Sequence, residues 1–519
     1  MSALFLTGMM GSGKTTIGRA LAKKLDLRFI DLDEEIERHT GKTIAELFEL
    51  HGEAGFRKIE SERLRNLPTE GAVVATGGGA VTSSANVAIM MKNGCIVCLN
   101  APISVLEQRI AQSAVRPLYK DKSSLGRLLA ARSSDYALCD ISIDTDRSVS
   151  KTVGVLADSL APTSKRPLMA GDNVYIAPDL IHENIPARLL PKASKFAIVT
   201  HPRLHKHADG IARRIGKSSI MEVPSSEKSK SLKRLEMLLE DFASFGLKRD
   251  DAAIALGGGV IGDLTGFAAA VYMRGIDYIQ MPTTLLAQVD AAIGGKTGIN
   301  LKLGKNLAGA FHMPTAVVCD TSLLETLPRR QLVNGSAEIV KYGAILDPAI
   351  FLRCQQRSIW KPYPVHWFDL RSNIVHRCAQ LKLSVVNEDP LERQGRRVIL
   401  NFGHTIGHGL EQAMGFRGIL HGEAVALGMM AESYIAWRMD IADESLLDRL
   451  SVALRRQGLP VRANLPPTDE IMSALQRDKK NTADRVRMAI VQEAGKSVVL
   501  QDAPKDLIRE AIEWIREEA

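Results

Sequence analysis

The sequence of 519 residues lacks several features that mark membrane, secreted or repeat proteins. It has no run of about 18 apolar residues, and its opening passes too quickly into a glycine loop to hold a signal peptide. Its six cysteines are too few and too dispersed for a disulfide framework, and it has no repeat of about 20 to 50 residues. We therefore expect a cytoplasmic protein with no membrane partner and no solenoid architecture.

Aromatic residues are also scarce, at 5% of the chain, and no basic run is interleaved with them as single-strand nucleic-acid binding requires. The formal net charge of +8 therefore favours small anionic substrates over a nucleic acid. Cys95 and Cys98 form a CxxC pair, but they lie in the apolar, β-branched run "CIVCLN" with no second pair at zinc-finger spacing. We interpret them as strand cysteines rather than as a redox or metal motif.

The chain length predicts about three structural units. Short apolar strands alternate with helical segments over residues 1–160, which predicts an α/β unit with a parallel sheet, and residues 161–167 have the composition of a linker. A second α/β alternation covers residues 168–327. From residue 328 to 519 long helical periodicities replace the strands, so the last third should be mainly helical.

A phosphate-binding loop is the first functional motif. The stretch "GMMGSGKT", residues 8–15, fits the pattern GxxxxGK[ST] and lies between a predicted strand and a predicted helix. Glycines at these positions let backbone N–H groups surround phosphates at a helix N-terminus. Lys14 is expected to reach the β and γ phosphates, and the Thr15 hydroxyl to bind Mg²⁺, so this unit should use ATP with Mg²⁺.

The residues that follow this loop indicate the acceptor. Asp31 and Asp33 stand two apart, so an extended segment would place both carboxylates on one face; the alternative is a helix N-cap followed by a first-turn charge. Arg57 and the glycines 77–79 follow at the next strand ends, where open α/β sheets bind ligands, and Arg132 completes the set. Carboxylates suit hydroxyl groups and arginine suits a carboxylate, so a small polyol acid is indicated.

On these motifs, residues 1 to about 160 resemble shikimate kinase, which transfers the γ-phosphoryl group of ATP to shikimate. The resemblance implies that Asp31 is the Mg²⁺-linked aspartate and that Lys14 and Asp33 are catalytic, Asp33 as the group that accepts the proton. The implied ATP contacts are Gly11, Ser12, Gly13, Lys14, Thr15, Thr16 and a lid arginine, Arg116. The implied shikimate contacts are Asp33, Arg57, Gly77, Gly78, Gly79 and Arg132.

A glycine turn opens the candidate site of the second unit. The stretch "ALGGGVIGDLTGF", residues 255–267, predicts a strand, a turn and a helix that carries Asp263. It is not GxGxxG, and alone it fits a mere tight turn as well as a nucleotide-binding turn. Neighbouring residues strengthen the interpretation of this turn as part of a nucleotide-binding site. Thr283 and Thr284 lie at another strand end, and a glycine-rich loop, residues 289–306, gathers Asp290, Lys296, Lys305 and Asn306.

Two histidines four residues apart, His404 and His408 in "LNFGHTIGHG", share one face of a predicted helix. They can bind one metal ion together, or one can bind it while the other moves a proton. His421 follows in "LHGEAV", and Glu338 lies three residues before Lys341, either in an exposed ion pair or in the site. Imidazole and carboxylate ligands of this kind suit Zn²⁺.

These motifs together make residues 168–519 resemble 3-dehydroquinate synthase. The resemblance implies an NAD-binding α/β domain followed by a helical metal-binding domain, with NAD⁺ and Zn²⁺ (or Co²⁺) as cofactors. The implied reaction converts the seven-carbon phosphorylated sugar acid DAHP to 3-dehydroquinate through transient oxidation, phosphate loss, re-reduction, ring opening and aldol closure. We also expect a homodimer through the synthase part.

The same resemblance assigns residue roles. Glu338, His404 and His421 are the implied metal ligands, which leaves His408 as the proton-handling base, and Lys296 and Lys341 are further catalytic residues. The implied NAD contacts are Glu227, Lys230, Gly258, Gly259, Asp263, Thr283, Thr284 and Thr326. The implied DAHP contacts are Arg274, Asp290, Lys296, Lys305, Asn306, Lys341, Lys382, Arg397, Asn401 and either Lys479 or Lys480. The chain departs from the family at Ser226, where a glycine is usual.

We therefore predict a bifunctional shikimate-pathway enzyme, kinase first and synthase second. One alternative is a small-acid kinase fused to a metal-dependent polyol dehydrogenase, which would accumulate NADH with its substrate. Another is a non-catalytic interaction module, which the intact Lys14, Asp33, Glu338 and His408 disfavour. Because other steps separate the two reactions, the fusion should serve co-expression, and separately expressed halves should show similar rates.

Overall fold

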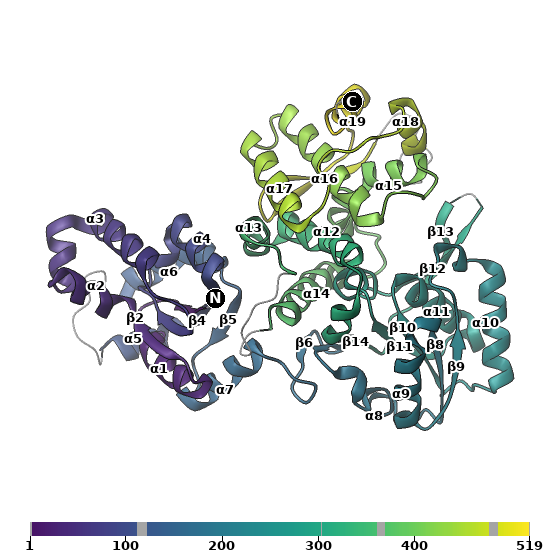
Figure 1. The fold of residues 1–519 in the computed structure, drawn as a ribbon, viewed down its shortest axis with the longest axis horizontal. Coiled ribbons are helices and arrows are strands. Elements are labelled where there is room, and N and C mark those ends of the chain that lie inside the picture. Colours follow the sequence, from purple (N-terminus) through teal and green to yellow (C-terminus); the bar gives the residue numbers. More distant parts are fainter. Residues whose placement is uncertain (1–2, 112–121, 303, 361–368, 477–485, 518–519) are drawn as a thin grey trace. The chain divides into compact units, whose positions relative to one another are not determined.

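The computed structural model describes residues 3–111, 122–302, 304–360, 369–476 and 486–517. The chain divides into two compact units: unit 1 comprises residues 1–161 and 347–370, and unit 2 comprises residues 162–346 and 371–519. Both contain parallel sheets covered by helices, so the predicted α/β class is confirmed (Figure 1). Within the described ranges, no helix is long and apolar enough to span a bilayer.

Unit 1 is built on a five-stranded parallel sheet with the strand order β2-β3-β1-β4-β5. Its strands are β1 (Ala3–Thr7), β2 (Arg28–Asp31), β3 (Ala72–Ala75), β4 (Gly94–Asn100) and β5 (Ile141–Asp144). Its helices are α1 (Lys14–Leu25), α2 (Leu32–Thr40), α3 (Ile44–Asn66), α4 (Ser84–Asn93), α5 (Ile103–Ala111), α6 (Lys122–Tyr136), α7 (Val149–Leu160) and α13 (Pro348–Gln356).

The central strands of unit 1 are buried on both faces, as their continuous apolar runs predict. Phe5 of β1 packs in a core cluster with residues of α2, α3 and α4, while its neighbours Leu4 and Leu6 are buried on the opposite face. Cys95 and Cys98 lie buried on β4 as free thiols. The interpretation of this CxxC pair as strand cysteines is therefore confirmed.

Helix α13 belongs to unit 1, although the predicted division placed its residues in the helical C-terminal domain. Ala349 on this helix lies in the core cluster that also contains Val87, Met90 and Met91 of α4. The sequence predicted a mainly helical region over residues 328–519 but gave no indication that one of its segments packs in unit 1.

Unit 2 contains a seven-stranded sheet with the order β6-β7-β14-β11-β10-β8-β9, in which only β6 pairs antiparallel to its neighbour among the described strands. Its strands are β6 (Leu168–Ala170), β7 (Val174–Ala177), β8 (Lys195–Thr200), β9 (Lys217–Glu222), β10 (Ala252–Gly257), β11 (Asp277–Pro282) and β14 (Ala316–Asp320). The helices of this part are α8 (Ile185–Leu189), α9 (His205–Ile215), α10 (Leu232–Phe245) and α11 (Gly259–Val271).

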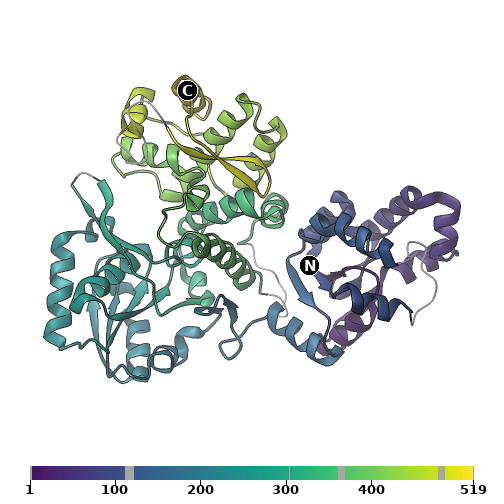
Figure 2. The same ribbon diagram turned by 180° about the vertical axis from the view of Figure 1, so that it is seen from behind.

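Helices cover both faces of this sheet (Figure 2). Alternating residues of β8 pack against different helices. Phe196 and Ile198 of β8 pack in a cluster with α8 and α9, whereas Ala197 and Val199 pack with α10 and α11. The sheet is thus covered on both faces, as expected for parallel strands.

The last third of the chain is mainly helical, as its periodicity predicts. Its helices are α12 (Arg329–Leu346), α14 (Leu370–Glu388), α15 (His404–Ala413), α16 (His421–Arg438), α17 (Glu444–Gln457), α18 (Thr468–Gln476) and α19 (Lys505–Trp514). Two antiparallel hairpins accompany the sheet and helices of unit 2, one of β12 (Lys296–Leu301) and β13 (Gly304–Phe311), the other of β15 (Met488–Glu493) and β16 (Lys496–Leu500).

Candidate functional sites

The glycine loop of unit 1 joins β1 to α1 and needs glycine for two separate reasons. Gly8 has φ 134°, and a Cβ atom there would lie 2.3 Å from the Leu99 carbonyl oxygen. Gly13 has φ 90° and caps the helix that begins at Lys14. The Lys14 ammonium donates to the carbonyl oxygens of Gly8, at 2.9 Å, and Met9, at 3.1 Å. A helix N-terminus with a cation above it is suited to bind phosphates.

Asp31 lies at the end of β2, and a hydrogen bond from Thr15 connects it to the residues that follow the glycine loop. The Thr15 hydroxyl donates to Asp31 Oδ2 at 2.8 Å, and Asp31 Oδ1 accepts from the Asp33 backbone N–H at 3.1 Å as the N-cap of α2. The prediction of two aspartates on one extended segment is wrong, because Asp33 already lies in the first turn of α2. Thr15 and Asp31 are nevertheless adjacent, as a shared Mg²⁺ site would require.

The predicted acceptor-binding residues surround the glycines 77–79, which follow β3. A Cβ atom built on Gly77 would lie 3.4 Å from Asp33 Oδ1, and one built on Gly79 would lie 2.1 Å from a terminal nitrogen of Arg57. One on Gly78 would lie 3.7 Å from Arg132. The structure thus brings Asp33, Arg57 and Arg132 to one glycine turn, while Arg116 lies outside the described residues.

Sequence reasoning missed Glu60, which is fully buried beside this turn. Its Oε2 accepts from Arg57 at 2.8 Å, and Glu53 accepts from the same guanidinium at 3.1 Å. Burial raises the pKa of Glu60, although Arg57 opposes that shift. The three-residue spacing between Arg57 and Glu60 was the available signal, since such residues are neighbours on a helix.

In unit 2 the predicted nucleotide-binding turn lies at the carboxyl ends of β10 and β11. Gly258 caps α11, and a Cβ atom there would lie 3.0 Å from the Thr284 side chain, so this turn admits only glycine without a shift. The Thr283 N–H donates to the Gly257 carbonyl oxygen at 3.0 Å, which ties the two strand ends together. Gly259 begins α11, and this sheet edge is where open α/β folds bind ligands.

Lys230 connects two sets of predicted contacts. Its ammonium lies 2.6 Å from Asp263 Oδ2 and 3.8 Å from Glu227, and it also donates to the Asn306 side chain. Burial raises the pKa of Asp263, and Lys230 lowers it in turn. Asn306, with φ 53°, belongs to the β12–β13 hairpin. The implied NAD contacts Glu227, Lys230 and Asp263 thus adjoin an implied DAHP contact.

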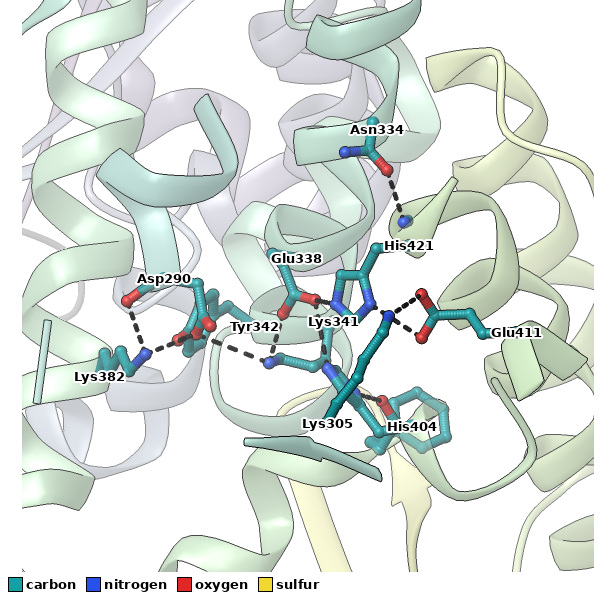
Figure 3. A network of polar contacts seen from close by, with 12 residues as sticks. Asp290, Lys305, Asn334, Glu338, Lys341, Tyr342, Lys382, His404, Glu411 and His421 are labelled. Atoms are coloured by element: carbon teal, nitrogen blue, oxygen red, sulfur yellow. Dashed lines mark hydrogen bonds and ion pairs between the residues drawn. The ribbon is translucent and has the colours of Figure 1, made fainter. Parts of the chain in front are cut away.

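Asp290 lies in a π-helical turn, Ala287–Ala291, and three side chains from other helices contact its carboxylate (Figure 3). Lys382 Nζ lies 2.9 Å from Asp290 Oδ1, the Tyr342 hydroxyl donates to the same oxygen at 2.5 Å, and Lys341 Nζ is 3.8 Å away. Burial alone would raise the pKa of Asp290, but Lys382 and Lys341 hold it far below its ordinary value. Lys341 also pairs with Glu338, so two buried lysines and two carboxylates form one connected group.

Glu338, His404 and His421 meet as a group of potential metal ligands (Figure 3). Glu338 Oε1 lies 3.5 Å from Nε2 of each histidine. His404 Nδ1 donates to the Phe402 carbonyl oxygen at 3.2 Å, and His421 Nδ1 lies 3.5 Å from Glu411 Oε2. These outer contacts turn both Nε2 atoms toward Glu338, an arrangement that metal-binding histidines commonly show.

The chemistry of this group fits a metal ion. Both carboxylate oxygens of Glu338 are buried, and neither accepts a well-aligned hydrogen bond in the described part of the chain, although Lys341 forms an ion pair with one of them. Burial raises the pKa of Glu338, but Lys341 and His404 lower it to about 2, so the ligand oxygen is ionised. Glu338 and Lys341 are both buried, so an exposed ion pair is excluded.

A second group, His408, Glu411 and His421, also lies within ligand distance. The two groups share His421 but approach it from opposite sides, Glu338 toward Nε2 and Glu411 toward Nδ1. Glu411 already has a partner, because Lys305 Nζ lies 3.2 Å from its Oε1. The buried oxygens of Glu338 therefore favour the first group as the metal centre, with Glu411 as an orienting residue.

Glu432 holds the helix that carries His404 and His408. It is fully buried on α16, and its two oxygens accept from the backbone N–H groups of Gly403, at 2.6 Å, and Ile406, at 3.2 Å. These are N–H groups that a helix start leaves without partners. Burial raises the pKa of Glu432 to about 8, even though these bonds lower it. The apolar run around Glu432 gave no signal of this role.

The other predicted residues occupy varied positions. Lys296 Nζ lies 2.6 Å from Glu392, and Arg397 donates to the carbonyl oxygens of Gly294, at 3.4 Å, and Pro390, at 3.0 Å. Asn401 ends the short helix η8 (Arg396–Asn401) before His404.

Two predicted contacts, Arg274 and Thr326, are not linked to this site in the described part of the chain. Arg274, on η5 (Tyr272–Arg274), and Thr326, on η7 (Thr321–Thr326), are exposed, and no hydrogen bond among the described residues ties either to the residues of Figure 3. Lys479 and Lys480 lie outside the described residues.

The role of Glu411 can be tested through metal binding. Replacement of Glu411 by glutamine should weaken the affinity for Zn²⁺ or Co²⁺ by about 10- to 100-fold, because His421 would lose the carboxylate that orients it. Competition with a chromophoric chelator measures this affinity without turnover. A loss of all binding, equal to that of Glu338→Ala, would instead make Glu411 a ligand.

Comparisons with known proteins follow the division into two parts. The family model described as shikimate kinase matches residues 10–161, and those described as 3-dehydroquinate synthase N-terminal and C-terminal match residues 220–334 and 335–481. A 3-dehydroquinate synthase of Dictyoglomus thermophilum is 43% identical over 298 residues, which cover 57% of this chain and 82% of that protein.

Two solved structures resemble the second part. One is ValA, a 2-epi-5-epi-valiolone synthase of Streptomyces hygroscopicus with NAD⁺ and Zn²⁺ bound; its TM-score is 0.59 at 27% identity, over 66% of this chain and 96% of that one. The other is a 2-deoxy-scyllo-inosose synthase with carbaglucose-6-phosphate, NAD⁺ and Co²⁺, with a TM-score of 0.57 at 26% identity, over 67% of this chain and 98% of that one.

Proposed function

We propose residue roles for an enzyme of two activities, because this chain belongs to the 3-dehydroquinate synthase family and carries a shikimate kinase domain before it. Its substrates are small molecules. The enzyme phosphorylates shikimate with ATP and converts DAHP to 3-dehydroquinate with loss of phosphate, at two separate steps of the shikimate pathway. The observation that carries the synthase assignment is the buried Glu338 carboxylate, which faces two imidazoles beside two lysines.

In the kinase site, Thr15 and Asp31 would hold Mg²⁺, and Lys14 would stabilise the charge that develops on the transferred phosphoryl group. Asp33 would bind the shikimate hydroxyls and take the proton of the attacking one. Arg57 and Arg132 would bind the shikimate carboxylate, and Glu60 would keep Arg57 in place through their 2.8 Å hydrogen bond. ATP bound with Mg²⁺ would supply the phosphoryl group.

In the synthase site, Glu338, His404 and His421 would hold the metal ion, and the glycine turn at Gly258 would receive the nucleotide. When bound, NAD⁺ would take up and return a hydride, and Zn²⁺ or Co²⁺ would polarise the hydroxyl group that is oxidised. His408 would move protons to and from the substrate. It lies one helical turn from His404, and the two ring centroids are 5.4 Å apart.

The remaining assignments concern substrate charge and assembly. Lys341, Lys382 and Arg397 would bind the phosphate and carboxylate of DAHP. We propose a cytoplasmic homodimer without nucleic-acid or membrane partners. The six buried cysteines agree with a reducing compartment. Four exposed apolar side chains support the dimer. Those side chains are Val271, Met273, Phe311 and Met313.

Phosphate release from DAHP tests the synthase assignment. With substoichiometric NAD⁺, the enzyme should release phosphate over many turnovers without net NADH, and removal of the metal by a chelator should abolish release until Zn²⁺ or Co²⁺ is restored. A polyol dehydrogenase would instead accumulate NADH in step with its substrate. For the kinase, shikimate should stimulate ADP production, and an unrelated small acid that stimulated it instead would exclude the assignment.

A further inference from the structure

The kinase unit includes a helix whose sequence belongs to the synthase family. Helix α13, Pro348–Gln356, lies within the stretch that matches the C-terminal synthase model, residues 335–481, yet it packs in unit 1. The rest of unit 1 is residues 1–161, which the shikimate kinase model matches from residue 10. The chain therefore passes between the two units three times: after residues 161, 346 and 370.

An ion pair fixes α13 within unit 1. Arg353 is 2% exposed, and both ends of its guanidinium donate to the two carboxylate oxygens of Asp140, with Nε at 2.6 Å from Oδ1. Arg353 also donates to the Gly94 carbonyl oxygen at 3.3 Å. A two-pronged arginine–carboxylate contact shielded from water is more specific and stronger than a surface ion pair.

The aspartate in this pair is part of the kinase sheet. Asp140 Oδ2 accepts from the Ile96 N–H at 2.8 Å, and the Asp140 N–H donates to the Ile96 carbonyl oxygen at 2.9 Å. Asp140 thus holds the approach to β5 against β4, and Arg353 neutralises its charge in a site that is largely buried. Removal of Arg353 would take this two-pronged contact away from the carboxylate.

Apolar and backbone contacts accompany the ion pair. Ala349 is 2% exposed within the core cluster of unit 1, and Leu352 packs against that cluster. At its start, α13 is capped by Asp347, which accepts from the N–H groups of Ala349 and Ile350. At the far end of the segment, the Asp369 N–H donates to the Leu160 carbonyl oxygen at 2.7 Å, at the end of α7.

The position of α13 keeps it away from the kinase chemistry. Gly94 begins β4 and Ile141 begins β5, so Arg353 contacts the amino-terminal edge of the parallel sheet. The phosphate loop and Asp31 lie at the carboxyl ends of β1 and β2, at the opposite edge. A helix at the first edge can support the fold without covering the substrates.

We propose that α13 is a docking element which the synthase part of the chain supplies to the kinase, and that the kinase depends on the Arg353–Asp140 pair for its stability. The occupant of the kinase surface is thus a segment of this same chain. The proposal does not depend on the catalytic roles assigned above.

Hydrogen exchange of the full-length chain tests this dependence. Arg353→Met keeps the aliphatic stem and removes the charge, so peptides covering β4 and β5 should exchange at least about tenfold faster, while peptides covering β10 keep their rates. The thermal transition that Mg-ADP and shikimate raise should fall by on the order of 5 to 10 °C. Kinase turnover at a temperature well below the transition should stay within about twofold, because the pair lies at the far edge of the sheet.

Two further variants complete the experiment. Gln356→Ala, on the same helix, should leave exchange in β4 and β5 unchanged. In a double-mutant cycle with Asp140→Asn, the combined change should be smaller than the sum of the single changes, because the two side chains share one contact. Unchanged exchange in β4 and β5 of Arg353→Met, or equal acceleration in β10, would overturn the proposal.

Discussion

Replacement of Lys14 by alanine should reduce shikimate phosphorylation by at least about 10²-fold while DAHP conversion keeps its rate. The ammonium lies on the glycine loop, 2.9 Å from the Gly8 carbonyl oxygen, at the N-terminus of α1. It is therefore placed to offset the negative charge that spreads over the transferred phosphoryl group. Parallel assays of ADP formation with shikimate and of phosphate release from DAHP measure both activities in one preparation.

Lys24→Ala is a suitable control, because Lys24 is exposed in the last turn of the same helix. It should leave both activities unchanged. Thermal unfolding of Lys14→Ala, followed in the same preparation, shows whether the variant stays folded under the conditions of the assays. If Lys14→Ala lost both activities equally, the two sites would not be independent.

The fold was largely predictable because local rules determine it. The phosphate loop and the Gly258 turn each lie between a strand and a helix whose residues are adjacent in the sequence, so the motif carries its own structural context. The alternation of Phe196 and Ala197 between two helix layers likewise follows from the period of a strand. Family resemblance then named the ligand set Glu338, His404 and His421, and the structure places these residues together.

The parts that sequence reasoning missed depend on contacts between distant residues. Glu432 caps a helix that begins 28 residues before it, and nothing in its apolar surroundings marks a buried carboxylate. Asp31 both caps α2 and accepts a hydrogen bond from Thr15, so Asp33 lies in the first turn of that helix. The sequence motif alone did not show whether Asp31 would cap a helix or continue the strand. Such assignments follow from packing, which a single sequence reveals poorly.

The position of α13 is the largest of these differences. Arg353 and Asp140 are 213 residues apart, and neither belongs to a recognised motif. The expectation that separately expressed halves would match the parent in rate assumed that each half carries its whole fold. A kinase cut after residue 161 would lack Arg353, so we now expect that half to lose stability before it loses intrinsic rate.

The pair His404 and His408 gives the sharpest test of the synthase site. Replacement of His408 by alanine should lower turnover of DAHP by about 10²- to 10⁴-fold and leave one metal ion per chain, because His408 is assigned to proton transfer and not to the ligand set. Replacement of His404 by alanine should remove the metal, since Glu338 and His421 alone offer two ligands where zinc sites usually have three from the protein. Elemental analysis after dialysis measures the metal, and His182→Ala, at an exposed histidine of unit 2, is the control.

The two groups that share His421 make this comparison decisive. If the metal lay instead with His408, Glu411 and His421, the outcomes would be reversed: His408→Ala would lose the metal and His404→Ala would keep it. The buried oxygens of Glu338 argue for the first arrangement, because an unpaired carboxylate in that site would be costly without a cation to complete it. Lys341 supplies only part of that charge, since it also faces Asp290. Retention of the metal by His408→Ala, together with the loss of turnover, would therefore show that the four-residue spacing holds a proton-transfer group beside the metal centre.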